Sequence, residues 1–540
     1  MNEKHFNLNA FPGDVCAQLK AAGQALRENP GATLLIPAGE YLITDPRAME
    51  ILEHVFAGTW GQNPQPVMFR PDFPYTIGLD LTGCRDVTVD AYGAVFKIRG
   101  YMEPVSIRDA ENVTVRGLTV DHDIKPFCRS VLTEVEEDGS GILTFDPQTP
   151  PTENMSAPRE ITYDPKTGGL AARFIDWYSE KEKLDETHYR MHAGFTPDEI
   201  GREFNFCTTY HFRPTVLISH SSNTRLEDLT LHNQPGMGIV GFKSRDIFIE
   251  RLRIVPSPGY HVSTNTDATH FACCAGTVSI EHSEFLGHGD DAINIHNYYY
   301  VIREKPAGNR VRIRVETPDG THSQEPDYPL AGYRLRLVDR STLFPVDTYT
   351  VLASSEEEEC EITLDHPLPD SGDYLFANIT DLPRLIFRSN RVSHHLARSV
   401  LCKTHNALIE NNYFHGGTGT AVHIAAEAFW GEGIESENVV VRGNTFRDCG
   451  FCGYGRTNGA SAVSLNIAAT DPTGVGIHKN ICIEDNTVTC PPDATYIFNI
   501  ANAQHVTLRR NRCSGCDKIA AIAYCEDVET DLSEDQIERG

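Results

Sequence analysis

The stretch Val439-Val440-Val441-Arg442-Gly443-Asn444-Thr445-Phe446 combines a short β-branched run with a turn and a further apolar residue. Alternation of inward and outward side chains along such a run is typical of a half-buried strand. Copies without an intervening insertion lie about 25 to 42 residues apart, the spacing of coils in a solenoid. The other copies lie at 113–120, 247–254, 278–285, 407–414, 481–488 and 506–513.

A second set of strands follows the first set in phase. The segments that begin at Gly238, Asp267, Asp291, Thr420 and Ser461 align without gaps. Two strand sets per repeat predict an all-β chain that forms a right-handed parallel β-helix, a pectate-lyase-like solenoid. A β-propeller is excluded, because a blade needs four strands in roughly 40 residues and its own motif, which is absent.

The repeat divides the chain into five parts. An amphipathic helix over 14–29 is expected to cap the open N-terminal end of the β-helix. The repeat is interrupted twice by segments of alternating strands and turns, which we expect to be β-rich insertions, the second barrel-like. The parts are 1–123 (cap and first coils), 124–215 (first insertion), 216–297 (coils with an acid cluster), 298–385 (second insertion) and 386–540 (C-terminal coils).

The composition limits the partners and the compartment. Lys and Arg number 47 against 75 Asp and Glu, a net charge of -28, which disfavours nucleic acid and anionic membranes as partners. No stretch approaches the roughly 18 apolar residues of a membrane span. The first residues lack the features of a signal peptide, and fifteen scattered cysteines do not resemble a disulfide framework, so a cytoplasmic location is expected.

Two CxxC pairs, Cys449 with Cys452 and Cys513 with Cys516, raise the question of zinc. The repeat places Cys449 and Cys516 two coils apart, about 10 Å at one strand spacing per coil. That separation is too large for one zinc ion. We therefore interpret these cysteines as buried, reduced thiols and expect no metal.

Three aspartates gather where the second strands begin. Asp267 and Asp291 hold the same position on successive coils, about 4.8 Å apart, and Asp290 is adjacent. We place them in the turn before the strand, where side-chain alternation need not hold. Like charges this close raise at least one pKa, and a protonated acid beside a carboxylate is the machinery of glycoside hydrolysis. A turn without function and a Ca²⁺ site are the alternatives.

Polar side chains are expected beside these acids. Alternation along the second strands turns His270, Asn294 and His423 outward, one above another. An aromatic ring such as that of Trp430 can stack on a sugar ring. Polar side chains on the outer face of a β-helix are also expected without any ligand. The remaining candidates for substrate binding are His296, Lys403, Glu427, Trp430 and Glu432.

These motifs resemble those of known families. Asn265-Thr266-Asp267 followed by Gly289-Asp290-Asp291 is similar to polygalacturonases, glycoside hydrolase family 28, whose later GHG and RIK motifs have no counterpart here. A closer match is glycoside hydrolase family 110, the β-helix α-galactosidases that remove α-1,3-linked galactose. Asn297 departs from the Gly usual in that family. The second resemblance covers roughly 80–125, 215–300 and 385–450, and it is carried by 235–238, 258–271, 289–296, 407–414 and 430–433.

The resemblance implies an exo-acting, inverting α-galactosidase that uses no metal or cofactor and acts on galactose-containing oligosaccharides or glycans. Asp290 would protonate the leaving oxygen, and Asp267 and Asp291 would hold and deprotonate the attacking water. A homodimer is compatible with this reading. Two alternatives stay open: another β-helix carbohydrate-active enzyme, either a glycosidase of different specificity or a calcium-dependent polysaccharide lyase, and a non-enzymatic glycan-binding β-helix.

Overall fold

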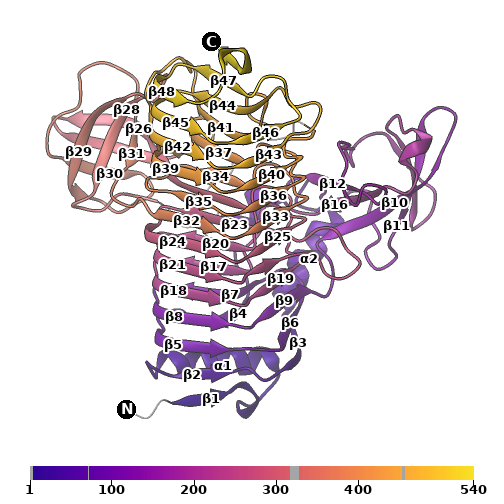
Figure 1. The fold of residues 1–540 in the computed structure, drawn as a ribbon. Coiled ribbons are helices and arrows are strands. Elements are labelled where there is room, and N and C mark those ends of the chain that lie inside the picture. The colour runs from indigo at the N-terminus through magenta and orange to yellow at the C-terminus, as the bar shows by residue number, and fades with distance from the viewer. Residues whose placement is uncertain (1–3, 71, 317–326, 453–455) are drawn as a thin grey trace.

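Three parallel sheets stack coil upon coil along one axis in the computed structural model, which describes residues 4–70, 72–316, 327–452 and 456–540 (Figure 1). The expected all-β, parallel β-helix is confirmed; its handedness and the capping role of its first helix stay predictions. The first sheet contains β1 (His5–Asn7), β2 (Thr33–Leu35), β5 (Arg85–Asp90), β8 (Glu111–Arg116), β18 (Ser222–Glu227), β21 (Arg245–Glu250), β24 (Ala275–Glu281), β32 (Arg384–Arg388), β35 (Leu408–Glu410), β39 (Glu437–Arg442), β42 (His478–Glu484), β45 (Ala503–Arg509) and β48 (Glu526–Thr530).

The other two sheets complete each coil. The second contains β3 (Gly39–Thr44), β6 (Ala94–Arg99), β9 (Thr119–His122), β19 (Thr230–His232), β22 (Arg253–Ile254), β25 (Glu284–Leu286), β33 (Arg391–Ser393), β36 (Tyr413–His415), β40 (Thr445–Arg447), β43 (Thr487–Thr489) and β46 (Arg512–Ser514). The third, which carries the acids at its edge, contains β4 (Ile77–Asp80), β7 (Glu103–Arg108), β17 (Val216–Ser219), β20 (Ile239–Phe242), β23 (Thr269–Ala272), β26 (Ile293–Ala307), β34 (Val400–Cys402), β37 (Val422–Glu427), β41 (Ala460–Ala468), β44 (Tyr496–Ala501), β47 (Ala520–Ala523) and β49 (Ile537–Arg539).

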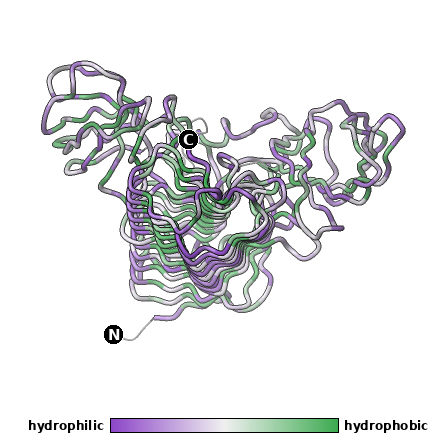
Figure 2. Tube along the Cα trace, turned by 45° about the horizontal axis from the view of Figure 1, so that its top comes forward, coloured by the Kyte–Doolittle hydropathy of each residue, from purple (hydrophilic) through white to green (hydrophobic). Residues whose placement is uncertain are grey.

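The core lies inside the coils, where hydrophobic residues line the inner face of the tube (Figure 2). The register stacks equivalent positions, so that Ile280 pairs with Phe387 and Phe387 with Ile409 on consecutive coils of the first sheet. The rings of Phe387, Phe414 and Phe446 stack in turn, with centroids 6.3 and 5.1 Å apart. The apolar alternation of the repeat is therefore the set of side chains that fills this interior.

Asparagines form a buried ladder at the turn between the first and second sheets. Asn444 Oδ1 accepts from the backbone N–H and the Nδ2 of Asn412, and Asn444 Nδ2 donates to Ile409 O and to Asn486 Oδ1. The same bonds link the neighbouring rungs. The Asn of the repeat thus satisfies backbone groups that the turn leaves without strand partners. The rungs are Asn390, Asn412, Asn444, Asn486 and Asn511.

Removal of one rung should destabilise the fold. Asn444→Ala leaves the buried N–H of Asn412 and the carbonyl of Ile409 without their partners, which costs roughly 1–3 kcal/mol for each unsatisfied group. We expect a lower midpoint of thermal unfolding, measured by calorimetry. Thr445→Ala, at the exposed neighbouring position, is the control and should leave the midpoint unchanged. Equal midpoints for the two variants would contradict a structural role for the ladder.

The first interruption of the repeat forms a seven-stranded antiparallel sheet, ordered β13-β12-β16-β10-β11-β15-β14. It projects to one side of the β-helix (Figures 1 and 2). Its own core packs the buried side chains of Trp177, Tyr189 and Phe206 together. Its strands are β10 (Phe127–Val135), β11 (Ser140–Phe145), β12 (Arg159–Asp164), β13 (Gly169–Leu170), β14 (Lys181–Lys183), β15 (His188–His192) and β16 (Glu203–Cys207).

The second interruption closes into a barrel on another side of the β-helix (Figure 1). Antiparallel pairings connect β26, β27, β30, β29, β28 and β31 in a ring that returns to β26. β26 belongs to both the third sheet and the barrel, so the expected boundary between 297 and 298 falls inside one strand. The further strands are β27 (Arg310–Val315), β28 (Arg334–Asp339), β29 (Pro345–Ser354), β30 (Cys360–Leu364) and β31 (Tyr374–Asn378).

The N-terminal region contributes α1 (Val15–Arg27), α2 (Pro46–Ala57), α3 (Gln65–Met68) and the 3-10 turn η1 (Leu8–Ala10). Further 3-10 turns lie in the first insertion, η2 (Pro197–Glu199), and near the C-terminus, η3 (Glu534–Gln536). α1 lies within the expected segment 14–29 and packs against β4, β3 and β2. The repeat does not predict α2, whose Ile51 and Val55 pack with Tyr101 and Phe212. Among the described residues, no helix has both the length and the apolar character needed to cross a membrane.

One copy of the second strand set was aligned incorrectly. Ile239 pairs with Thr269, so the segment that begins at Gly238 is off by one residue in the sequence alignment. The reason lies in the core: Gly241 faces inward, and a Cβ there would lie 2.6 Å from the ring of Phe271. The Phe of the next coil fills this space, so an alignment that follows large apolar residues misplaces the strand.

Candidate active site

Asp267, Asp290 and Asp291 line one cavity at the edge of the third sheet. Carboxylate oxygens from all three lie within 4.8 Å of one another. The register that pairs Thr269 with Ile293 places Asp267 and Asp291 on successive coils, in the turns before β23 and β26. The Asp291 N–H donates to Asp267 Oδ1 over 3.2 Å. The cavity measures about 90 Å³, below the ~300–1,000 Å³ of pockets for drug-sized ligands, and suits a small ligand.

Two arginines that the sequence analysis missed hold these acids. Arg159, at the start of β12 in the first insertion, lies 2.8 Å from Asp290 Oδ2. Arg398 binds Asp291 twice, through its backbone N–H and its guanidinium, each at 2.8 Å. Arg398 is two residues before β34, which pairs with β26, so its position matches that of Asp291 on the next coil. Arg398 could not be predicted, because the three residues of β34 are too few to reveal their coil, and no coil spacing encodes Arg159.

The arginines divide the three carboxyl groups into different protonation states. Burial favours the neutral form of Asp290, but Arg159 and Arg398 outweigh burial and hold its pKa below the ordinary value of 3.8. Burial raises the pKa of Asp291 to about 8 despite Arg398. Burial and the charges of Asp290 and Glu432 raise the pKa of Asp267 well above its ordinary value. The site therefore pairs an ionised carboxylate with protonated neighbours.

A chain of hydrogen bonds gives the same protonation state for Asp267. The Asn297 carbonyl only accepts, so the Nδ1 of His296, 3.1 Å away, carries the hydrogen. Burial lowers the pKa of His296 to about 3 and that of His270 to about 4, so both rings are neutral. His296 Nε2 therefore accepts from His270 Nε2 over 2.8 Å. His270 Nδ1 then acts as the acceptor, and the proton in its 2.7 Å bond comes from Asp267.

Glu427 and Glu432 form another wall of the cavity around a buried lysine. Lys403 Nζ lies 2.6 Å from Glu427 Oε2 and also binds Glu432. Asn294 Nδ2 donates to Glu432 over 3.2 Å. Burial raises the pKa of both glutamates, but the buried ammonium of Lys403 lowers both, and both stay below their ordinary value. The hairpin that carries these glutamates is thus fixed to the coils.

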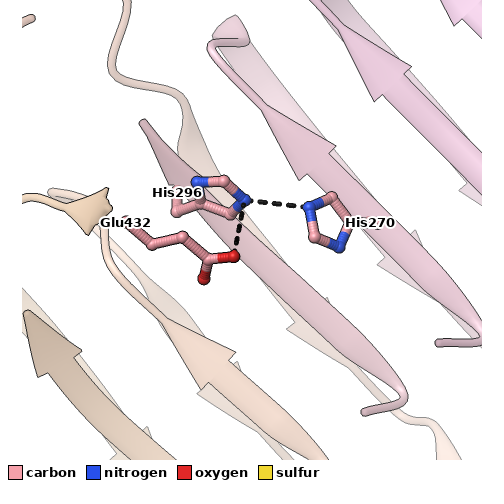
Figure 3. Close-up of side chains that lie close together, drawn as sticks. All are labelled: His270, His296 and Glu432. Carbon is pink, nitrogen blue, oxygen red and sulfur yellow. Dashed lines mark hydrogen bonds and ion pairs between the residues drawn. The ribbon is translucent and has the colours of Figure 1, made fainter. Parts of the chain in front are cut away.

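The residues expected to bind substrate fall into two groups. His270, Asn294, Glu427, Trp430 and Glu432 line the cavity together with the acids, and Trp430 is 40% exposed. His296 lies behind His270, with its Nε2 facing both His270 and Glu432 (Figure 3). Lys403 is fully buried beneath the glutamates. The further lining residues are His211, Met237 and Arg398, which the sequence analysis did not select.

The expected column of outward residues needs a correction. His270 pairs with Asn294, but Asn294 pairs with Leu401, and only then follows His423. The three-residue strand β34 is too short to show the repeat pattern. The coil that contains β34 is therefore absent from the sequence alignment. His423 bonds Asn466 over 3.0 Å and does not line the cavity.

Within the described part of the chain, two clusters offer atoms that could hold a metal ion: the three aspartates, and His270, His296 and Glu432. The ligand atoms of each cluster lie within 4.8 Å of one another. Carboxylate and imidazole are suitable ligands for divalent cations. In both clusters a protein cation already binds the carboxylates, Arg159 and Arg398 in the first and Lys403 in the second. The protein thus supplies positive charge that a metal would otherwise bring.

Comparison with known proteins gives one consistent name. Alpha-1,3-galactosidase B of Akkermansia muciniphila is 26% identical over 501 residues, which cover 87% of this chain and 60% of that protein. Alpha-1,3-galactosidases B and A of Bacteroides thetaiotaomicron are 26% and 23% identical, over 87% and 84% of this chain and 78% and 81% of theirs. The chain is similar to alpha-1,3-galactosidases over most of its length. No family model matches it.

Several solved structures are similar to this chain over almost its whole length. An exopolygalacturonase from Thermotoga maritima has a TM-score of 0.46 at 11% identity, covering 99% of this chain and 93% of its own. A tailspike protein of bacteriophage HK620 has a TM-score of 0.45 at 10% identity, covering 99% and 67%. These scores are too low to bear on the function.

Proposed function

We propose that the protein is a glycoside hydrolase that removes a terminal α-1,3-linked galactose from a galactose-containing glycan and inverts the anomeric configuration. One observation carries the proposal: Asp267 and Asp290 face the same small cavity, where burial raises the pKa of Asp267 and the arginines hold that of Asp290 low. The similarity to alpha-1,3-galactosidases supports the sugar and the linkage. A cavity of about 90 Å³ at the acids supports cleavage at the end of a glycan.

Within this proposal, Asp267 donates the proton to the leaving oxygen and Asp290 activates the water. This reverses the roles expected from the sequence. Asp290 lies beside Arg159, which stabilises its carboxylate, whereas Asp267 completes a hydrogen-bond chain that requires its proton. A general acid has to be protonated at the working pH, and a general base ionised.

The stereochemistry is supported by the family resemblance rather than by the spacing of the acids. Oxygens of the three carboxylates lie within 4.8 Å of one another. Inverting glycosidases usually separate their carboxyl groups by roughly 6.5–9.5 Å, and retaining enzymes by roughly 5–5.5 Å. NMR of the first-formed galactose decides: β-galactose from an α-galactoside supports inversion, and α-galactose contradicts it.

A release assay tests the reaction itself. The wild-type chain is incubated with α- and β-linked aryl galactosides and with α-1,3- and α-1,4-linked galactosyl disaccharides, and free galactose is measured. We expect release from the α-linked substrates, fastest from the α-1,3-linked disaccharide. Absence of galactose from every α-linked substrate would exclude the proposed activity.

One observation favours a polysaccharide lyase as a second candidate. A lyase needs a basic side chain near its acids, and Arg159 and Arg398 meet this condition. Both guanidinium groups, however, bind Asp290 and Asp291 directly, so neither is available as a base. On uronate polymers, with calcium added, we expect no unsaturated product that absorbs in the ultraviolet.

The pH dependence follows from the protonation states. At low pH, Asp290 takes up a proton only near or below its ordinary pKa of 3.8, so the base stays active down to about pH 4. At high pH, Asp267 loses its proton at a pKa well above its ordinary value, and the acid is lost. Asp291 loses its proton at about 8 and adds a second negative charge to the cavity. We expect kcat/KM to be highest in acid and to fall above neutrality. A rise in kcat/KM between pH 6 and pH 9 would contradict the assignment.

A further inference from the structure

Phe429 is 71% exposed, the highest value among the large hydrophobic side chains in the described parts of the chain. Most phenylalanines of a folded protein are buried, and contiguous exposed apolar surface often marks a ligand-binding groove. Its ring meets that of Trp430 edge to face, with centroids 5.1 Å apart. Since Trp430 lines the catalytic cavity, the two rings form a continuous aromatic surface that leads out of it.

The turn that carries these rings is held in place from both sides. It connects β37 to β38 (Glu432–Gly433), and Glu427 pairs with Glu432 across its base. β38 also pairs with β26, where Tyr298 faces Glu432. The buried Lys403 binds both glutamates. Phe429 is therefore exposed at a fixed position, which lowers the entropy cost of binding a ligand there.

A groove lies beyond Phe429, between the barrel and the coils. It measures about 580 Å³, against about 90 Å³ for the catalytic cavity. Arg340, Ser341 and Asp373 line it from the barrel, and Thr470 lines it from the loop after β41. Arg340 and Asp373 lie 3.8 Å apart and are about half and three-quarters exposed, so their hydrogen-bonding groups are available. The ring of Phe429 can pack against the apolar face of a sugar, and the charged side chains can donate to and accept from its hydroxyl groups. Because the two charges are opposite, the groove suits neutral sugars.

We propose that Phe429 and the barrel edge around Arg340 and Asp373 bind the sugars that follow the cleaved galactose. The inference rests on the proposed function. The catalytic cavity is small, about 90 Å³, so the rest of a longer glycan would extend past Trp430 toward the groove. The ligand is a neutral oligosaccharide aglycone of at least two sugars.

The test compares substrates of increasing length. For the wild-type chain, kcat/KM is measured on an aryl α-galactoside and on α-1,3-galactosyl di-, tri- and tetrasaccharides, and we expect it to increase with length. Phe429→Ala should lower kcat/KM for the tetrasaccharide by about tenfold and leave the aryl substrate unchanged. Arg340→Ala, on the opposite wall, should give the same pattern.

Leu352→Ala provides a matched control, because Leu352 is 57% exposed on the barrel and does not line the groove. Leu352→Ala should leave kcat/KM unchanged for all substrates. The proposal is overturned if wild-type kcat/KM does not depend on the length of the oligosaccharide. It is also overturned if Phe429→Ala lowers kcat/KM equally for all substrates. If the wild-type chain hydrolyses the aryl substrate but kcat/KM does not change with oligosaccharide length, sugar binding in the groove is refuted and the proposed function is not. No hydrolysis of any substrate refutes the proposed function and this inference with it.

Discussion

Replacing Asp267 by asparagine should lower kcat/KM for an α-1,3-galactosyl disaccharide by about a thousandfold. An amide cannot donate a proton to the leaving oxygen at the necessary rate. Its Nδ2 can still donate to His270 Nδ1, as the protonated carboxyl does, so the hydrogen-bond chain and the fold should survive. Initial rates on the disaccharide measure the loss, and circular dichroism checks the fold.

The leaving group distinguishes the acid from the base. If Asp267 is the donor, Asp267→Asn should lose much less activity on an aryl galactoside with an acidic phenol, which leaves without protonation. Asp290→Asn should be equally slow on both substrates, and added azide should restore turnover. The opposite pattern would return the donor role to Asp290. Asp517→Asn, at an exposed position near the C-terminus, is the control and should behave as wild type.

Replacing Lys403 by methionine should be the most destabilising single change at the site. It leaves the carboxylates of Glu427 and Glu432 buried without their cation, and breaking a buried ion pair in this way costs about 3–5 kcal/mol. Methionine has a similar length, so the loss reflects charge rather than volume. The midpoint of thermal unfolding measures it, and activity should fall because Glu432 lines the cavity.

The pH dependence of this loss identifies its cause. Lys403 lowers the pKa of both glutamates in the wild type, and a lowered pKa stabilises the fold above the unfolded value of 4.5. That stability disappears as pH falls and the glutamates take up protons. The difference between Lys403→Met and wild type should therefore be fully present above pH 4.5 and shrink below it. A difference independent of pH would point to packing. Lys20→Met, exposed on α1, should show no loss.

The fold could be predicted because its signal is periodic. Inward residues such as Ile280, Ile409 and Val441 recur at one position per coil, and each also packs on its neighbours in the structure. The coil of β34 could not be found in this way, since three residues carry too little alternation. Helix α2 packs outside the repeat, on Tyr101 and Phe212, and so has no counterpart in the pattern.

The site could be predicted only as far as the coils build it. Asp267 and Asp291 come together because backbone pairing fixes their register. Arg159 reaches Asp290 from an insertion whose packing depends on its own core, which no coil spacing encodes. Since Arg159 holds the pKa of Asp290 low, the sequence could indicate that the acids share a proton but not which carboxyl group carries it.

Strand β26 begins two residues after Asp291 and runs without interruption into the barrel. No linker separates the two, so the barrel cannot swing or slide independently of the catalytic coil. Among related proteins, glycan preference should therefore change through substitutions in the loops at the edge of the barrel, while the barrel itself stays in the same position. Grafting a related barrel at both ends of the insertion should transfer preference while leaving the chemical step intact.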